Sequence, residues 1–213
     1  FAHARAPQVT EPAPEATQVH KHADHDHPSD AWGPAEGVER MGYTLLANVL
    51  TAAGFALVML AAMVASLKRN AAAKFDWRYG LLWGAAGYAV FFVTPSLGLP
   101  PEIPGAAAAP LGARQLWWVL TVVCTAAGLA GAAFGKTHWR WAALGLLVVP
   151  YLVGAPHPAT SPFADYPPAA TAELAKLARQ FVWATALANA MFWLALGSAS
   201  VWAVRRFLKK AVA

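Results

Sequence analysis

Long runs without a charged residue dominate this sequence and restrict how it can fold. Residues 41–67, 79–99, 115–135 and 180–204 contain no Asp, Glu, Lys or Arg. Each run exceeds the roughly 18 apolar residues that mark a segment able to cross a hydrocarbon core about 30 Å thick. Lipid offers no hydrogen-bonding partners, so a segment that crosses it must satisfy its backbone internally, as a helix does. The runs therefore predict an all-α, polytopic membrane protein.

The composition agrees with lipid as the main partner. Only 13% of the residues are charged, against roughly 25% in a typical soluble domain. The net charge of +5 is no sign of nucleic-acid binding, because the basic residues stand in short groups beside apolar runs. We therefore expect the lipid bilayer as a partner and no nucleic acid.

A fifth segment, residues 141–154 (WAALGLLVVPYLVG), is short for a crossing and contains Pro150, which costs a helix a hydrogen bond. Charge decides in favour of a crossing. If the segment crosses, three basic groups lie on one side, and the positive-inside bias favours that arrangement. These groups hold ten of the 16 basic residues: Lys68, Arg69, Lys74, Arg78; Lys136, Arg140; Arg205, Arg206, Lys209 and Lys210.

The expected layout is therefore a five-helix membrane protein with a cytoplasmic C-terminus. Residues 1–40 form an extracytoplasmic leader, residues 41–207 the transmembrane domain and residues 208–213 a cytoplasmic tail. The chain starts at Phe1 rather than Met. An outward leader needs an upstream helix or a cleaved signal peptide, so we expect a sixth helix, or a signal peptide, before Phe1.

Small residues on the runs favour close helix packing. Gly84, Gly87 and Tyr88 could line a channel, but tight contact between helix backbones is the stronger interpretation. Tryptophans near the ends of runs predict an interfacial belt: Trp117, Trp118, Trp139, Trp141 and Trp202.

The leader carries a dense group of metal-binding side chains within HKHADHDHP. Imidazole nitrogen suits Co²⁺, Ni²⁺, Cu²⁺ and Zn²⁺, and carboxylate oxygen broadens the range. We expect the leader to capture one of these ions, although a soluble, low-complexity spacer is the alternative. The predicted ligands are His20, His22, Asp24, His25, Asp26 and His27.

Two proline-rich loops are predicted on the same outer side as the leader. In TPSLGLPPEIPG, Glu102 lies in a stiff turn against the membrane, where a carboxylate could serve as a metal or proton site or simply be solvated. In GAPHPATSPFADYPP, His157 stands between two prolines and Asp165 follows. The three side chains could converge on one ion, or remain separate surface groups.

Motifs of catalysis and ATP use are absent. The chain has no Walker loop, GxSxG, HExxH or CxxC. We therefore expect neither an enzyme nor an ATP-driven motor, and no resident cofactor. No charged residue lies in the middle of a span, where ion pathways usually have one, so a path would need a partner subunit or uncharged oxygens.

The order TPSLGLPPEIPG, ARQLWW and GAPHP, after a His-rich stretch, resembles the CbtA family of probable cobalt transporter subunits. The resemblance covers nearly the whole chain, and the proline–glutamate loop followed by RQxWW is its specific part. It departs at the front, where the family's first helix is missing from this sequence. It implies a small bacterial membrane protein of five or six helices.

The resemblance also implies site residues. Glu102, Arg114, Gln115 and His157 match the motif positions. Glu102 and His157 would supply metal ligands, Arg114 would pair with Glu102 or anchor at headgroups, and Gln115 would hydrogen-bond between helices. Alternatively, all four brace the outer loops.

Two functions follow as hypotheses. The chain is an uptake component for a divalent transition metal, foremost cobalt, whose leader collects the ion. The other hypothesis is a non-transporting accessory subunit of a larger membrane complex. As a partner we expect a small membrane subunit of the same transport system.

Overall fold

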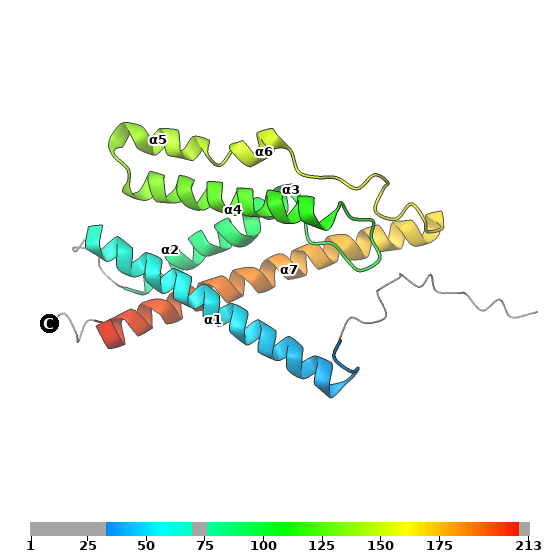
Figure 1. Ribbon diagram of the computed structural model, residues 1–213, viewed down its shortest axis with the longest axis horizontal. Coiled ribbons are helices and arrows are strands. Elements are labelled where there is room, and N and C mark those ends of the chain that lie inside the picture. Colours follow the sequence, from blue (N-terminus) through cyan, green and yellow to red (C-terminus); the bar gives the residue numbers. More distant parts are fainter. Residues whose placement is uncertain (1–32, 70–75, 209–213) are drawn as a thin grey trace, which may run out of the picture. The chain divides into compact units, whose positions relative to one another are not determined.

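A computed structural model describes residues 33–69 and 76–208, and these residues form helices and no strand (Figure 1). Four helical stretches are long and apolar enough to cross a membrane: Val38–Ser66, Trp77–Gly98, Leu111–Phe134 and Pro168–Phe207. The all-α prediction is therefore confirmed, and so is the prediction that the four charge-free runs form helices of spanning length.

The chain divides into two compact units, Phe1–Ala47 and Asn48–Ala213. The described part of the first unit contains the start of α1 (Val38–Arg69), just after Gly37 with a φ of +92°. Arg40 Nη1 donates to Glu36 Oε1 at 2.6 Å, and Thr44 Oγ1 donates to the Arg40 carbonyl at 2.8 Å.

The second unit includes the rest of α1 and every later helix. α2 (Trp77–Tyr88) continues through a π-helical turn, η1 (Ala89–Val93), into the short α3 (Thr94–Gly98). α7 (Pro168–Ala203) continues into a second π-helical turn, η2 (Val204–Leu208). Asp76 begins α2, because its carboxylate accepts the Tyr79 backbone N–H at 3.0 Å.

α2 and α7 pack backbone against backbone in antiparallel directions. A Cβ added to Gly84 would lie 2.5 Å from the Trp193 carbonyl oxygen and 2.9 Å from Leu194 Cα. One added to Gly80 would meet the Gly197 carbonyl at 3.0 Å. Glycine is required because any side chain would force the helices apart. The packing interpretation of Gly84 is thereby confirmed over the channel-lining one.

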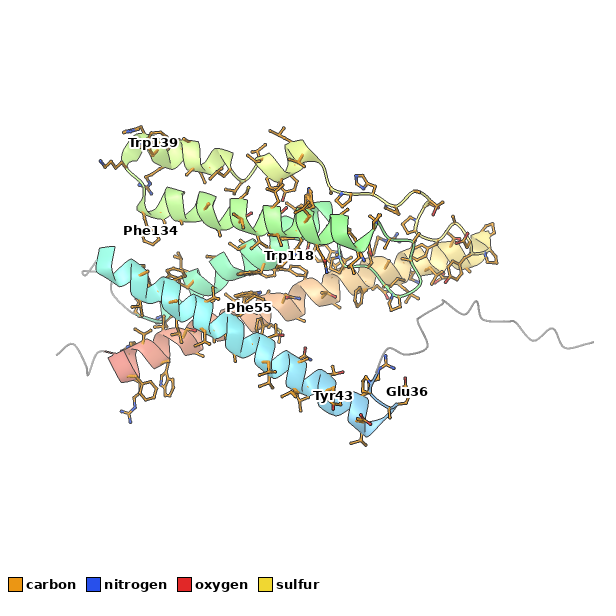
Figure 2. The ribbon with its side chains drawn as sticks, in the orientation of Figure 1. Glu36, Tyr43, Phe55, Trp118, Phe134 and Trp139 are labelled. Carbon is orange, nitrogen blue, oxygen red and sulfur yellow. The ribbon has the colours of Figure 1, made fainter. Side chains whose placement is uncertain are left out.

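An aromatic and methionine core lies beside this crossing. The Phe55 ring of α1 lies 4.9 Å from the Phe91 ring and 5.0 Å from the Trp193 ring, centroid to centroid (Figure 2). Phe91 and Trp193 stack at 5.1 Å, and the buried Met59 and Met63 complete the cluster. The described part of α1 in this unit thus joins the other helices through long side chains.

The prediction of a fifth transmembrane helix over residues 141–154 is wrong. This part of the chain forms two short helices, α5 (Thr137–Gly145) and α6 (Val149–Val153), and neither is long enough to span. Pro150 has no N–H to give, and in a continuous helix its ring would clash with the Leu146 carbonyl. The chain tightens before it into i→i−3 bonds, such as Val148 N–H to the Gly145 carbonyl at 3.1 Å.

The broken pair nevertheless runs antiparallel along α4 (Leu111–Phe134) and returns the chain to the end where α4 began (Figure 1). A Cβ on Gly128 would meet the Ala143 carbonyl at 2.9 Å, so the two segments pack closely there. Nearer the start of α4, Trp117 Nε1 donates to the Pro150 carbonyl at 3.1 Å. Phe134 and Trp139 flank the turn at the opposite end (Figure 2).

Two other expectations meet different outcomes. The His-rich leader and the predicted sixth helix lie outside the described residues. Of the five tryptophans, Trp118, Trp139, Trp141 and Trp202 are exposed, and their place in an interfacial belt stays a prediction. Trp117 is 4% exposed and hydrogen-bonded, so its side chain packs inside the protein. The indole N–H of Trp117 donates to the Pro150 carbonyl at the start of α6.

Candidate functional site

Two loops meet at one end of the second unit. The first, residues 99–110, joins α3 to α4, and the second, residues 154–167, joins α6 to α7. Ala107 N–H donates to the Pro162 carbonyl at 2.9 Å, and a Cβ on Gly105 would lie 3.0 Å from the Tyr166 hydroxyl. The two proline-rich motifs therefore lie side by side, although more than 40 residues separate them.

The helices that adjoin these loops, α3, α4 and α6, are joined by a small group of polar contacts around Thr94. Tyr151 Oη donates to the Thr94 carbonyl at 2.6 Å, which ties α6 to α3. Thr125 Oγ1 donates to Thr94 Oγ1 at 3.0 Å, which ties α4 to the same residue. Thr94 Oγ1 itself donates to the Ala89 carbonyl at 2.9 Å, across the π-helical turn η1.

The first loop forms a cleft with the start of α4. The cleft has a volume of about 680 Å³ and brings together three of the four motif positions. Its lining residues are Leu99, Pro100, Pro101, Glu102, Leu111, Arg114, Gln115, Trp118 and Val119.

Glu102 and Arg114 form an ion pair in this cleft. Arg114 Nη1 donates to Glu102 Oε2 at 2.8 Å, and the two side chains are 31% and 32% exposed. Pro100 and Pro101 fix the backbone before Glu102, while Arg114 stands in the first turn of α4, where its N–H bonds the Pro110 carbonyl. Of the two roles considered for Arg114, pairing with Glu102 is the one observed.

Gln115 is exposed in the same cleft, next to Trp118. Its expected hydrogen bond between helices is not found among the described residues. Gln115 is thus an exposed amide at the wall of the cleft.

His157 and Asp165 are both exposed on the second loop, and neither lines the cleft. Among residues 33–69 and 76–208, no three His, Cys, Asp or Glu side chains come close enough to hold one ion. The structure thus gathers Glu102, Arg114 and Gln115 at one place and leaves His157 on the neighbouring loop. The six predicted leader ligands, His20, His22, Asp24, His25, Asp26 and His27, lie outside the described residues.

Sequence reasoning missed the residues that support the loops. Trp117 and Thr94 were noted only as parts of motifs, Trp117 also for the expected belt, and Tyr151 is an uncharged residue in an apolar segment, so none of them indicated its contact. The one available clue was Pro95, which removes a helical donor next to Thr94 and makes an irregular, specially supported turn there predictable.

Four apolar helices of spanning length, with a cleft at one helix end, indicate a multi-pass α-helical membrane protein. The family model CbtA, described as probable cobalt transporter subunit, matches residues 3–205. The chain belongs to the CbtA family. No curated protein and no solved structure matches it.

Proposed function

We propose that this chain is a membrane subunit for uptake of a divalent transition metal ion, foremost cobalt. The supporting observation is the cleft, in which Glu102, Arg114 and Gln115 of a CbtA-family chain lie together at the loop end of the helices. A carboxylate and an amide oxygen are ligands that divalent ions accept. The family of transporter subunits also favours a non-enzyme.

The loop end is proposed to face the outside of a bacterial inner membrane. Arg78, Lys136, Arg140, Arg205 and Arg206 lie at the opposite ends of their helices from both loops. Cytoplasmic ends carry such an excess of Lys and Arg. This orientation puts the C-terminal tail, residues 208–213, in the cytoplasm.

The leader, residues 1–40, is proposed to collect the ion on the outer side. Its four clustered histidines and two aspartates offer nitrogen and oxygen ligands to Co²⁺, Ni²⁺, Zn²⁺ or Cu²⁺. From the leader the ion would pass to the outer mouth near Glu102 and His157, which are proposed as ligands on adjacent loops. Capture by the leader is expected to matter most when the metal is scarce.

An accessory, non-transporting subunit is the second candidate, favoured by the seam between α4 and its neighbours. Thr121 and Thr125 in this seam are 0% and 1% exposed, and Cys124 is also buried, so the seam is packed shut. No charged residue lies in residues 115–135 to carry an ion through. In this case a small membrane protein of the same transport system would provide the path.

Uptake of radiolabelled Co²⁺ by cells grown under cobalt limitation tests the proposal. Deleting the gene should lower uptake, and Glu102→Gln should reproduce much of that loss. The matched control is Glu173→Gln, which changes an exposed carboxylate at the start of α7, away from the cleft.

Replacing His20, His22, His25 and His27 together by Gln should reduce uptake at nanomolar but not at micromolar Co²⁺. Uptake that is unchanged by gene deletion contradicts the transport proposal. Normal uptake by Glu102→Gln and His157→Gln, together with stable co-purification of a membrane partner, favours the accessory subunit.

A further inference from the structure

The guanidinium of Arg114 is ion-paired with the carboxylate of Glu102, which is proposed to bind metal. The inference below rests on that proposed role of Glu102. We propose that Arg114 is a resident counter-cation, and that a divalent metal ion entering the cleft must displace it from Glu102. The site therefore works by exchange of one cation for another, and Arg114 sets its affinity.

The ion pair is placed where such an exchange can take place. The two side chains meet at 2.8 Å and each keeps about a third of its surface exposed, so solvent and ions reach both. Glu102 is held by the preceding prolines and Arg114 by α4. Rotation of the long Arg114 side chain alone would free the carboxylate, without movement of either backbone.

The present pose of Arg114 leaves one of its donors unused. Arg114 Nε is buried, and it has no hydrogen-bond partner anywhere in the described parts of the chain. A buried donor without a partner lowers the stability of the conformation that contains it. The guanidinium is thus paired through Nη1 alone, and the unpaired Nε weakens its hold on this orientation.

The cleft offers an incoming ion few ligands beyond the carboxylate. Gln115 adds an amide oxygen, and the remaining walls are prolines and apolar side chains. With no group of three metal-binding side chains in residues 33–69 and 76–208, an ion at Glu102 would retain several waters. Binding of this kind is weak and reversible, which suits an ion in transit.

The exchange predicts that Co²⁺ affinity rises when Arg114 loses its charge, whereas a purely structural role of Arg114 predicts that it falls. While Arg114 is paired, the carboxylate presents almost no net charge to a dication, and the guanidinium repels it. Removing that charge should strengthen Co²⁺ binding about three- to tenfold at low ionic strength, since exposed ion pairs are themselves weak. If Arg114 only braced the loop, its removal would weaken binding.

The experiment measures Co²⁺ binding to the purified full chain in lipid nanodiscs by equilibrium dialysis with the radiolabelled ion. All proteins carry His→Ala changes in the leader, so that the leader does not mask the cleft; the positions are His3, His20, His22, His25 and His27. Glu102→Gln, Arg114→Gln, Arg114→Met and Arg114→Lys are compared with this parent. Circular dichroism shows which variants retain their helices. Two uncharged replacements are made so that the comparison is still possible if one of them does not fold.

Tighter binding by the uncharged Arg114 variants, with affinity near the parent's in Arg114→Lys, supports the exchange. Equal or weaker binding by the uncharged variants, while Glu102→Gln still abolishes binding, overturns the exchange and leaves Glu102 as a metal ligand. Binding that does not change in Glu102→Gln removes the metal site at Glu102, and the inference falls with it.

Discussion

Gly84→Ala tests the close contact of α2 and α7, on which the second unit is built. The added Cβ would lie 2.5 Å from the Trp193 carbonyl oxygen, 2.9 Å from Leu194 Cα and 3.1 Å from the Trp193 carbonyl carbon. Ordinary contacts begin near 3.4 Å, so the helices must separate by about 0.9 Å. All three neighbours are backbone atoms, so no change of rotamer can relieve the clash.

The cost follows from these distances. Overpacking of this kind costs about 1–3 kcal/mol, and the backbone contact places Gly84→Ala near the upper value. Alanine returns up to about 1 kcal/mol through its higher helix propensity. The net loss is therefore about 2 kcal/mol, or roughly 4–8 °C in Tm for a chain of this length.

The assay heats the detergent-solubilised protein with a thiol-reactive fluorophore. Cys124 is the only cysteine of the sequence and is buried, so its reaction reports loss of the packed structure. The matched control is Gly54→Ala in α1, where an added Cβ meets nothing within 4 Å. The control should leave the apparent Tm unchanged or raise it slightly. Equal Tm values for the two variants would refute the proposed α2–α7 contact.

Further predictions concern the contacts that hold the loops. Trp117→Phe removes the donor to the Pro150 carbonyl and should lower stability by about 1–3 kcal/mol in the same thermal assay, whereas Trp118→Phe, at a partly exposed neighbour, should have a much smaller effect. An equal loss from both would show that the indole hydrogen bond is unimportant. Tyr151→Phe removes only the hydroxyl that bonds the Thr94 carbonyl and should cost about 1 kcal/mol, with Tyr166→Phe at an exposed tyrosine of the second loop as the comparison. A Tyr151→Phe protein as stable as the parent would contradict the link between α6 and α3.

Residues 141–154 show where sequence reasoning about the fold stopped. The apolar runs fixed four helices, because spanning length and freedom from charge are properties of a single segment. The same reasoning recognised that Pro150 would disturb a helix. It still predicted a continuous crossing, because a crossing places all three basic groups on one side of the membrane. The positions of the basic groups indicate only the side on which each loop lies. A pair of short helices, α5 and α6, returns the chain to the same end as a single helix would, so these positions cannot distinguish the two.

The sequence by itself determined that this chain is helical and suited to lipid, that its histidines and acidic residues cluster apart from its apolar runs, and that it is a CbtA-family protein. Those features are local in the chain. Only the tertiary structure decided that Glu102 meets Arg114 and Gln115 in one cleft, that His157 lies on the adjacent loop, and that Trp117 is buried. These facts depend on which helix faces cross at glycines and where Pro150 breaks the returning segment. Contacts between residues far apart in the chain leave no periodic trace in it.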